Sequence, residues 1–536
     1  MRAGETTGDA AQPDTGTGNG TDRTGARTDR PEDTRLDDTE LRQLDWVRRL
    51  GTLGALLMAV GAAGAGAAPV FNPVPRFPLI GLLPRIPTVS MAIVYTGMIV
   101  VIASWLWLGR LTATGRPRWI SRSQMDRTLV MWMIPLAIAP PMFSRDVYSY
   151  LAQSKIAFLG LDPYEIGPAQ ALGVDDPLTR GVPNVWRDTP APYGPFFLTL
   201  GKLVSWIGGD HVVTSVLLHR VIALAGIAMI LWAVPRLARR CGVRPVTALW
   251  LGPANPLVLF HLVSGVHNEA LMVGLMLAGL EIALRPGLRW ILVGATLMTC
   301  AAAVKVSAAP ALGFLGVALA LRWGGTFKDL FRAAALLTAV FVGVLAVIVL
   351  GSGLSLGWED SLVALEKIQS WKSPMTWLGG LGGSLGVLLG FGDHTAAVTG
   401  AWRVAGGIGS AAVMLWLLWT CFRRGEKYLH PVTGLGIALG VLVVLGPIVH
   451  PWYLVWAAIP LAASTSSIRF RITAVVLSIA MSVVDTPPGA NYEGRAFVVP
   501  WAIMAGIAVA GPLLLAVRKR MPGRLRSVRR AESAAH

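Results

Sequence analysis

Apolar segments long enough to cross a membrane recur along most of this chain of 536 residues. A helix needs about 20 mainly apolar residues to span the hydrocarbon core of a bilayer, and such runs follow one another from residue 47 to residue 517. Only 14% of the residues are charged, against roughly 25% in a soluble domain. The sequence therefore predicts an all-α polytopic membrane protein. About fourteen transmembrane helices are expected, near residues 47–68, 88–109, 127–143, 212–235, 246–262, 267–285, 288–304, 306–322, 332–351, 396–420, 431–449, 451–466, 470–485 and 497–517.

The distribution of positive charge predicts which loops lie inside the cell. With a cytoplasmic N-terminus, the inner loops hold 28 Arg and Lys residues and the longer outer loops hold 11. This asymmetry is typical of inserted helices, and it accounts for the net charge of +17 without nucleic acid as a partner. The large outer loops are then 144–211 and 352–395. The apolar stretch 195–209 is expected to lie in the interface or dip partway into the membrane.

The two ends of the chain are expected to be cytoplasmic tails of a protein in the plasma membrane. Residues 1–45 are mostly Thr, Gly, Asp and Arg, a composition that predicts disorder, and residues 518–536 are basic. One membrane domain, 46–517, remains. The three cysteines, at 241, 300 and 421, are scattered and predict neither a disulfide framework nor a metal site.

The stretch "FSRDVYSYLAQ" places an acid, Asp146, directly after the third expected span. Its continuation predicts an amphipathic helix on the outer leaflet, with Asp146 at the N-terminal end. The apolar residues that would share a helix face are Val147, Leu151, Ile156 and Phe158. A carboxylate at this position can cap the helix, and it can also accept a proton from a substrate hydroxyl at the lip of a cavity. The two interpretations are compatible.

Lys305 is isolated in the almost charge-free hairpin "CAAAVKVSAAP". A lysine at the end of a span can snorkel to the interface. Here it lies on the side where positive charge is disfavoured, which favours a role such as binding phosphate as a point charge. In "SGVHNEALM", Asn268 and Glu269 either cap and begin the sixth span or add a second acid to the outer rim.

Aromatic residues accompany these charges in "GLDPYEIGP", "APYGPFF", "WKSPMTW" and "HPWYLVW". Tyr and Trp rings suit sugars, although they also favour membrane interfaces. No Walker loop, GxSxG elbow, HExxH or Rossmann glycine pattern occurs in a suitable context, and the cytoplasmic side offers no folded domain. Chemistry is therefore expected outside the cytoplasm, where nucleotide donors are absent, so a lipid-borne donor is expected.

The motifs "SRDVYSYLAQSKIAFLGLDPYEIGP", "APYGP", "HNEALM", "KVSAAP" and "HPWYLVW" resemble the MptA/MptB group of actinobacterial polyprenol-phosphate-mannose-dependent α-1,6-mannosyltransferases, with MptB the closer match. The resemblance covers about residues 45–517. It implies a GT-C membrane glycosyltransferase bundle with extracytoplasmic loop helices. It also implies inverting transfer of mannose from polyprenyl-phosphate mannose to a mannan or glycolipid acceptor at the outer face. In many GT-C enzymes the acidic loop follows the first span, whereas here it follows the third.

The resemblance maps the family's acid onto Asp146, which would deprotonate the acceptor hydroxyl. Lys305, assisted by Arg145, would bind the donor phosphate, and no cofactor or metal is expected. The predicted substrate-binding residues are Tyr148, Asp162, Tyr164, Tyr193, His267, Asn268, Glu269, Lys372, His450, Trp452 and Tyr453. Two alternatives stay open: a transporter or flippase for a lipid-linked sugar, and a GT-C transferase for another sugar or acceptor.

Overall fold

A computed structural model describes residues 34–113, 115–358, 370–489 and 498–520. Within these ranges every regular element is a helix. The first half contains α1 (Asp38–Ala65), η2 (Val74–Arg76), η3 (Ile80–Arg85), α2 (Pro87–Thr112), α3 (Arg122–Ile138), α4 (Asp146–Phe158), α5 (Pro168–Leu172), α6 (Pro177–Gly181), α7 (Asn184–Arg187), α8 (Pro195–Gly208), α9 (Val212–Arg240) and α10 (Pro245–Leu251). The second half contains η4 (Val258–Ser264), α11 (Glu269–Ala283), α12 (Leu288–Ala302), η5 (Val306–Ala308), α13 (Pro310–Trp323), α14 (Phe327–Ser352), α16 (Pro374–Leu388), α17 (Thr395–Arg424), α18 (Pro431–Val444), η7 (Pro451–Tyr453), α19 (Leu454–Ser464), α20 (Ile468–Ser482) and α21 (Val498–Arg520).

A helix lies at each of the fourteen segments expected from the sequence, but fewer are long and apolar enough to span a membrane alone. Six of the described helices meet that condition: α2, α9, α13 with η5, α14, α17 and α21. A seventh span is possible if η4 and α11, which meet at an angle of 107°, are one broken span. The all-helical membrane fold is thus confirmed, while fourteen spans and the GT-C bundle stay predictions.

Helix α1 starts earlier than the sequence predicted. The Asp37 carboxylate accepts a hydrogen bond from the backbone N–H of Glu40, and the Glu40 carboxylate accepts one from Asp37 (2.8 and 3.1 Å). This reciprocal capping box satisfies two N–H groups at a helix start. Residues 38–45 are therefore helical, which corrects the prediction of disorder up to residue 45. Residues 1–33 and 521–536 lie outside the described residues.

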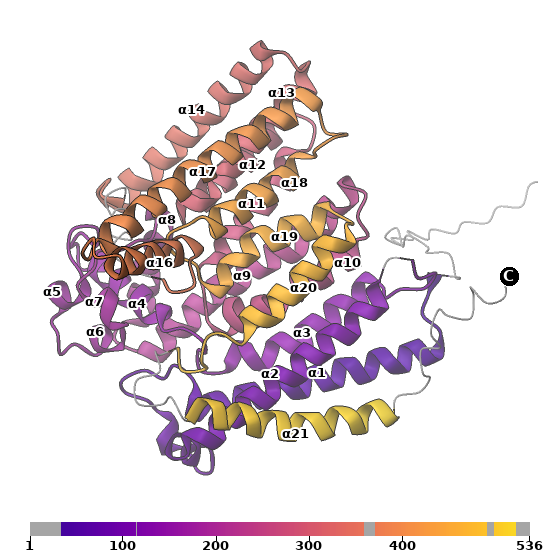
Figure 1. Ribbon diagram of the computed structural model, residues 1–536, viewed down its shortest axis with the longest axis vertical. Coiled ribbons are helices and arrows are strands. Elements are labelled where there is room, and N and C mark those ends of the chain that lie inside the picture. The colour runs from indigo at the N-terminus through magenta and orange to yellow at the C-terminus, as the bar shows by residue number, and fades with distance from the viewer. Residues whose placement is uncertain (1–33, 114, 359–369, 490–497, 521–536) are drawn as a thin grey trace, which may run out of the picture.

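The short helices α4 to α8 gather at one end of the bundle (Figure 1). In the same view α1, α2, α3 and α21 lie on one flank, α13, α14 and α17 lie on the other, and α9 and α11 lie between them. The structure corrects one detail here. Helix α4 was expected to be amphipathic, but all of its residues from Val147 to Ser154 are buried, because α8 and α9 pack against it.

The break between η4 and α11 positions three polar residues. The backbone leaves helical geometry at Gly265 and Val266, and α11 then starts at Glu269, directly after His267 and Asn268. Irregular backbone at membrane depth is tolerated only where protein covers it or a cavity adjoins it. The polar residues at this break are buried, and a cavity adjoins them.

Candidate active site

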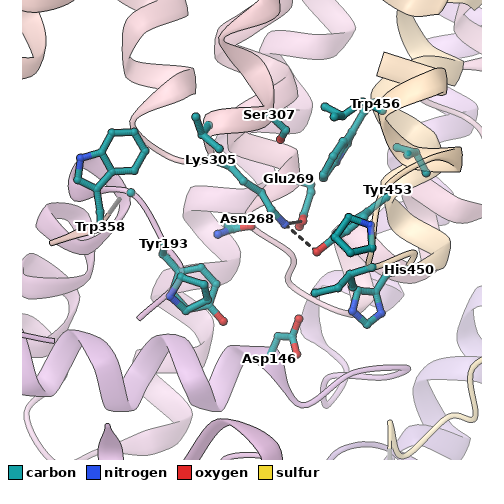
Figure 2. Close-up of a pocket in the computed structure, with 18 of the residues that line it drawn as sticks. Asp146, Tyr193, Asn268, Glu269, Lys305, Ser307, Trp358, His450, Tyr453 and Trp456 are labelled. Atoms are coloured by element: carbon teal, nitrogen blue, oxygen red, sulfur yellow. Dashed lines mark hydrogen bonds and ion pairs between the residues drawn. The ribbon is translucent and has the colours of Figure 1, made fainter. Parts of the chain in front are cut away.

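A cavity of about 520 Å³ lies at the end of the bundle where α4 to α8 gather. Helix α4, the break before α11 and the 305–310 segment form its polar wall, and α17, α18 and α19 form an apolar wall. Figure 2 shows the polar side chains facing one another across this space. The predicted site residues that line it are Asp146, Tyr193, Asn268, Glu269, Lys305, His450 and Tyr453.

Asp146 is the first residue of α4, and its carboxylate faces the cavity with a quarter of the side chain exposed. Arg145 occupies the N-cap position, and Ser144 Oγ accepts a hydrogen bond from the Asp146 N–H (3.0 Å). The capping interpretation of Asp146 is therefore wrong. Burial, and next the negative charge of Glu269, raise the pKa of Asp146 from 3.8 to about 6.

Lys305 lies between two hydrogen-bond partners in the centre of the cavity (Figure 2). Its Nζ donates to Glu269 Oε1 (2.6 Å) and to the Tyr453 hydroxyl (3.2 Å), and it lies 4.3 Å from the centre of the Tyr453 ring. Burial alone would lower the pKa of Lys305, but Glu269 and Tyr453 outweigh burial and hold this pKa above its usual value. Snorkelling is thus wrong for Lys305, which points into the protein as a cation.

Three rings form a stack beside the two acids. Trp452 lies between His267 and His450, with ring centroids 3.8 and 4.4 Å away. His450 lines the cavity, whereas His267 and Trp452 lie behind it. The His267 Nδ1 atom is 3.6 Å from Asp146 Oδ2 and 3.8 Å from Glu269 Oε2. The stack therefore keeps a fixed imidazole between the two carboxylates.

Comparison with known proteins adds the identity of the chain. Residues 48–321 match the family described as α-(1→6)-mannopyranosyltransferase, N-terminal domain, and residues 375–515 match the MptB C-terminal domain. The chain is 46% identical over 518 residues to a probable α-(1→6)-mannopyranosyltransferase of Mycolicibacterium smegmatis, covering 91% of each protein. It is 42% identical to an α-(1→6)-mannopyranosyltransferase of Mycobacterium tuberculosis (91% of this chain, 90% of the relative). It is 37% identical to α-(1→6)-mannopyranosyltransferase B of Corynebacterium glutamicum (90% and 83%).

The chain belongs to the MptA/MptB family. It is therefore a glycosyltransferase, and the family prediction made from its motifs is confirmed. The match of residues 375–515 to the MptB C-terminal domain agrees with MptB as the closer group.

Four predicted substrate contacts of this MptA/MptB chain lie outside the cavity lining and support it instead. The Tyr164 hydroxyl donates to the Tyr193 carbonyl (3.0 Å), and Asp162 Oδ1 accepts from the Tyr164 N–H (2.8 Å). The Tyr148 hydroxyl donates to the Ala67 carbonyl (2.5 Å). These bonds hold the outer loops, so the residues shape the site without reaching it. Trp452, already described, is the fourth.

Two predicted cations of the family member are directed elsewhere. The Arg145 guanidinium donates to the carbonyls of Gly181 (3.1 Å) and Ala68 (3.4 Å), so it anchors loops and does not face the cavity. Lys372 forms an ion pair with Asp485. Burial raises the pKa of Asp485, and Lys372 opposes that effect. Arg145 and Lys372 are thus committed to contacts with the protein.

The cavity of the MptA/MptB chain also contains residues that sequence reasoning missed. Those that carry rings or a hydroxyl are Tyr150, Trp186, Ser307, Trp358 and Trp456. Three of them belong to the quoted motifs "DVYSYLAQ", "KVSAAP" and "HPWYLVW", so the motifs themselves contained the signal. The two tryptophans at 186 and 358 come from loops in which nothing in the sequence marks them. Within the described ranges, no group of three or more His, Cys, Asp or Glu residues is arranged to hold a metal ion.

Proposed function

We propose that this glycosyltransferase moves mannose from polyprenyl-phosphate mannose to a mannan or glycolipid acceptor at the extracytoplasmic face, with inversion and an α-1,6 linkage. The observation that carries the proposal is that Asp146 and Lys305 line one cavity between a polar and an apolar wall. A base for the acceptor and a cation for the departing phosphate must both reach one bound lipid phosphosugar. Family membership supports the sugar and the linkage.

The chemistry is a single displacement. The acceptor hydroxyl oxygen forms a bond to the anomeric carbon while the bond from that carbon to the phosphate oxygen breaks. The hydroxyl proton goes to Asp146, and the bonding electrons go to the phosphate of the departing lipid. With a pKa of about 6, Asp146 is mainly ionised at neutral pH yet more basic than an ordinary aspartate, which suits general base catalysis.

Lys305 stabilises the charge that develops on the phosphate. An ammonium group has three N–H donors, and Glu269 and Tyr453 accept from it in the protein alone. The third donor is suited to a phosphate oxygen. A fixed cation directed at developing charge is the kind of electrostatic help that is usually large in catalysis. Glu269 keeps the lysine charged and oriented before the donor arrives.

The apolar wall supports a lipid as the donor. Beyond Pro310 on α13 and Met414 on α17, a second cavity of about 540 Å³ begins at the neighbouring residues Ala309 and Leu415. It is lined by apolar residues of α13, α14 and α17, apart from Thr338. A prenyl chain attached to a phosphate at Lys305 would continue into this groove. The hydrophobic effect favours such burial by about 0.8 kcal/mol per CH₂ group.

The charge asymmetry of the loops supports an extracytoplasmic site. Asp146 and Lys305 belong to the outer set of segments, where Arg and Lys are fewer. Labelling of a single cysteine placed in the outer loop, in intact cells, tests this orientation. Modification by a membrane-impermeant reagent supports it, and protection until the cells are broken would contradict it.

The central experiment uses the purified full chain in lipid nanodiscs with labelled polyprenyl-phosphate mannose and a synthetic α-1,6-linked dimannoside acceptor. Elongated product with a new α-1,6 bond is expected. Asp146→Asn should lose transfer and keep donor binding, whereas Lys305→Ala should lose donor affinity and rate together. Full transfer by Asp146→Asn at normal expression would remove the base, and unchanged donor KM and kcat in Lys305→Ala would remove the phosphate role. Donor movement across vesicles without product would favour a flippase.

A further inference from the structure

Arg220 is a buried cation that the proposed reaction does not use. It lies on α9 with 2% of its surface exposed. Its guanidinium donates three hydrogen bonds to backbone carbonyls. Nη1 donates to Ala137 (2.9 Å) and Ala139 (2.6 Å), and Nη2 donates to Ser264 (3.1 Å). One side chain thus joins two segments that are far apart in sequence.

These carbonyls lie at the ends of two helices. Ala139 is the C-cap of α3, and Ser264 is the last residue of η4. The final carbonyls of a helix have no partner within it and form the negative end of its dipole, so a guanidinium satisfies and stabilises them. Burying the charge without these bonds would be costly. Arg220 therefore fixes where both helices end.

Each helix end leads to a cavity carboxylate through a left-handed turn. Phe143 (φ 68°) is three residues before Asp146, and Val266 (φ 59°) is three residues before Glu269. A left-handed backbone is rare for bulky residues and for β-branched ones above all. It costs about 1–3 kcal/mol and persists only where the surroundings impose it. The two acids thus follow equivalent strained turns.

The two turns are packed against each other. A Cβ added to Gly265 would lie 3.1 Å from the Met142 carbonyl oxygen, so only glycine lets the two backbones approach this closely. The Phe143 ring also stacks on the Phe260 ring of η4, with centroids 5.7 Å apart. Movement of either turn would therefore disturb the other.

We propose that Arg220 is a positioning residue that sets the separation between Asp146 and the Glu269–Lys305 pair by holding both turns from one guanidinium. Its effect on catalysis rests on the proposed function, because it requires these acids to act in transfer. Its effect on the two turns is a property of the protein alone. A displacement of about 1 Å at a reacting group can cost on the order of 100-fold in rate.

The test compares Arg220→Met, which removes the donors, with Arg220→Lys, which keeps the charge and some donors. Trp105→Phe is the matched control. It deletes another buried bond to a carbonyl, from Trp105 Nε1 to Trp250 O (2.9 Å), in a contact between α2 and α10. The measurements are melting temperature, kcat and donor KM, and hydrogen exchange in peptides that cover residues 142–146 and 265–269.

For Arg220→Met we expect kcat to fall on the order of 100-fold, while the donor KM stays within about threefold. Exchange should accelerate in both peptides together, and Arg220→Lys should recover part of both effects. Trp105→Phe should lower the melting temperature and leave kcat and both peptides unchanged. If Arg220→Met behaves like Trp105→Phe, Arg220 has only a structural role and the proposal is overturned.

A second variant covers the case in which Arg220→Met does not fold. Val266→Gly removes the strain of one turn and keeps the guanidinium. We expect an equal or higher melting temperature, faster exchange in residues 265–269 alone, and a lower kcat. An unchanged kcat would overturn the proposal. Full transfer by Asp146→Asn would sink the proposed base instead, and the exchange measurements would still decide the role of Arg220.

Discussion

Asp146 carries a cost in stability that its replacement should reveal. Its pKa rises from 3.8 in an ordinary aspartate to about 6 in the folded protein, through burial and next through the Glu269 charge. At roughly 1.4 kcal/mol per pKa unit, this shift corresponds to about 3 kcal/mol. Asparagine has nearly the same shape and no charge. Asp146→Asn should therefore be about 3 kcal/mol more stable than the native chain at pH 7 while losing transfer.

The sign follows from proton linkage. Between pH 3.8 and 6 the folded state holds a proton that the unfolded state has released, so stability falls as the pH rises through this range. Above pH 6 both states are ionised and the full penalty applies, and below pH 3.8 both are protonated and it disappears. The advantage of Asp146→Asn should therefore be constant above about pH 7 and shrink steadily towards pH 4.

The assay is thermal unfolding of the nanodisc-embedded chain from pH 4 to pH 8, together with initial transfer rates. An ionised base with a pKa of about 6 predicts that kcat/KM of the native chain falls about tenfold from pH 7 to pH 5. Glu165→Gln, on an exposed loop residue, is the control and should change neither curve. If Asp146→Asn is no more stable at pH 7, or its advantage does not depend on pH, the carboxylate is not buried as the structure has it.

Three further predictions concern the cavity and its surroundings. Glu269→Gln leaves the cavity lysine unpaired and should cost about 3–5 kcal/mol, and polyprenyl phosphate should raise its melting temperature more than that of the native chain; an equal rise would contradict the phosphate site. Gly316→Leu, which places a side chain in the apolar groove, should raise the KM of a long-chain donor about tenfold, since displacing two methylenes costs about 1.6 kcal/mol. A short-chain donor should be unaffected, as should the exposed Gly343→Leu control. Lys372→Met leaves the Asp485 carboxylate buried without its ion pair, so its melting temperature should be lower than native at pH 8, and the deficit should shrink towards pH 5 as Asp485 takes up a proton; a deficit independent of pH would refute this account.

The sequence predicted the helical segments well because the signal for each is local. A run of apolar residues must be buried in lipid or protein, and its backbone can be satisfied within its own helix. Asp146 and Lys305 stood out for the same reason, since each is a charge in a segment where charge is unexpected. The expected start of α1 was late because the capping box at Asp37 and Glu40 was not weighed.

The structure decided which polar residues share a cavity. Arg145 and Asp146 are neighbours in sequence, yet the guanidinium turns to the carbonyls of Gly181 and Ala68 while the carboxylate faces the cavity. Tyr148 and Tyr150, two residues apart on α4, likewise differ, and only Tyr150 lines the cavity. A helix rotates each successive side chain by about 100°, so the direction each one faces depends on where the helix packs.

The sequence by itself determined that this is an α-helical membrane protein of a mannosyltransferase family, because periodic apolar runs and contiguous motifs are written along the chain. Only the tertiary structure decided that Glu269 pairs with Lys305, that Trp452 separates two histidines, and that Arg220 joins the ends of α3 and η4. Each of these contacts joins residues that are 15 or more positions apart in the chain, and their meeting depends on packing across the whole bundle.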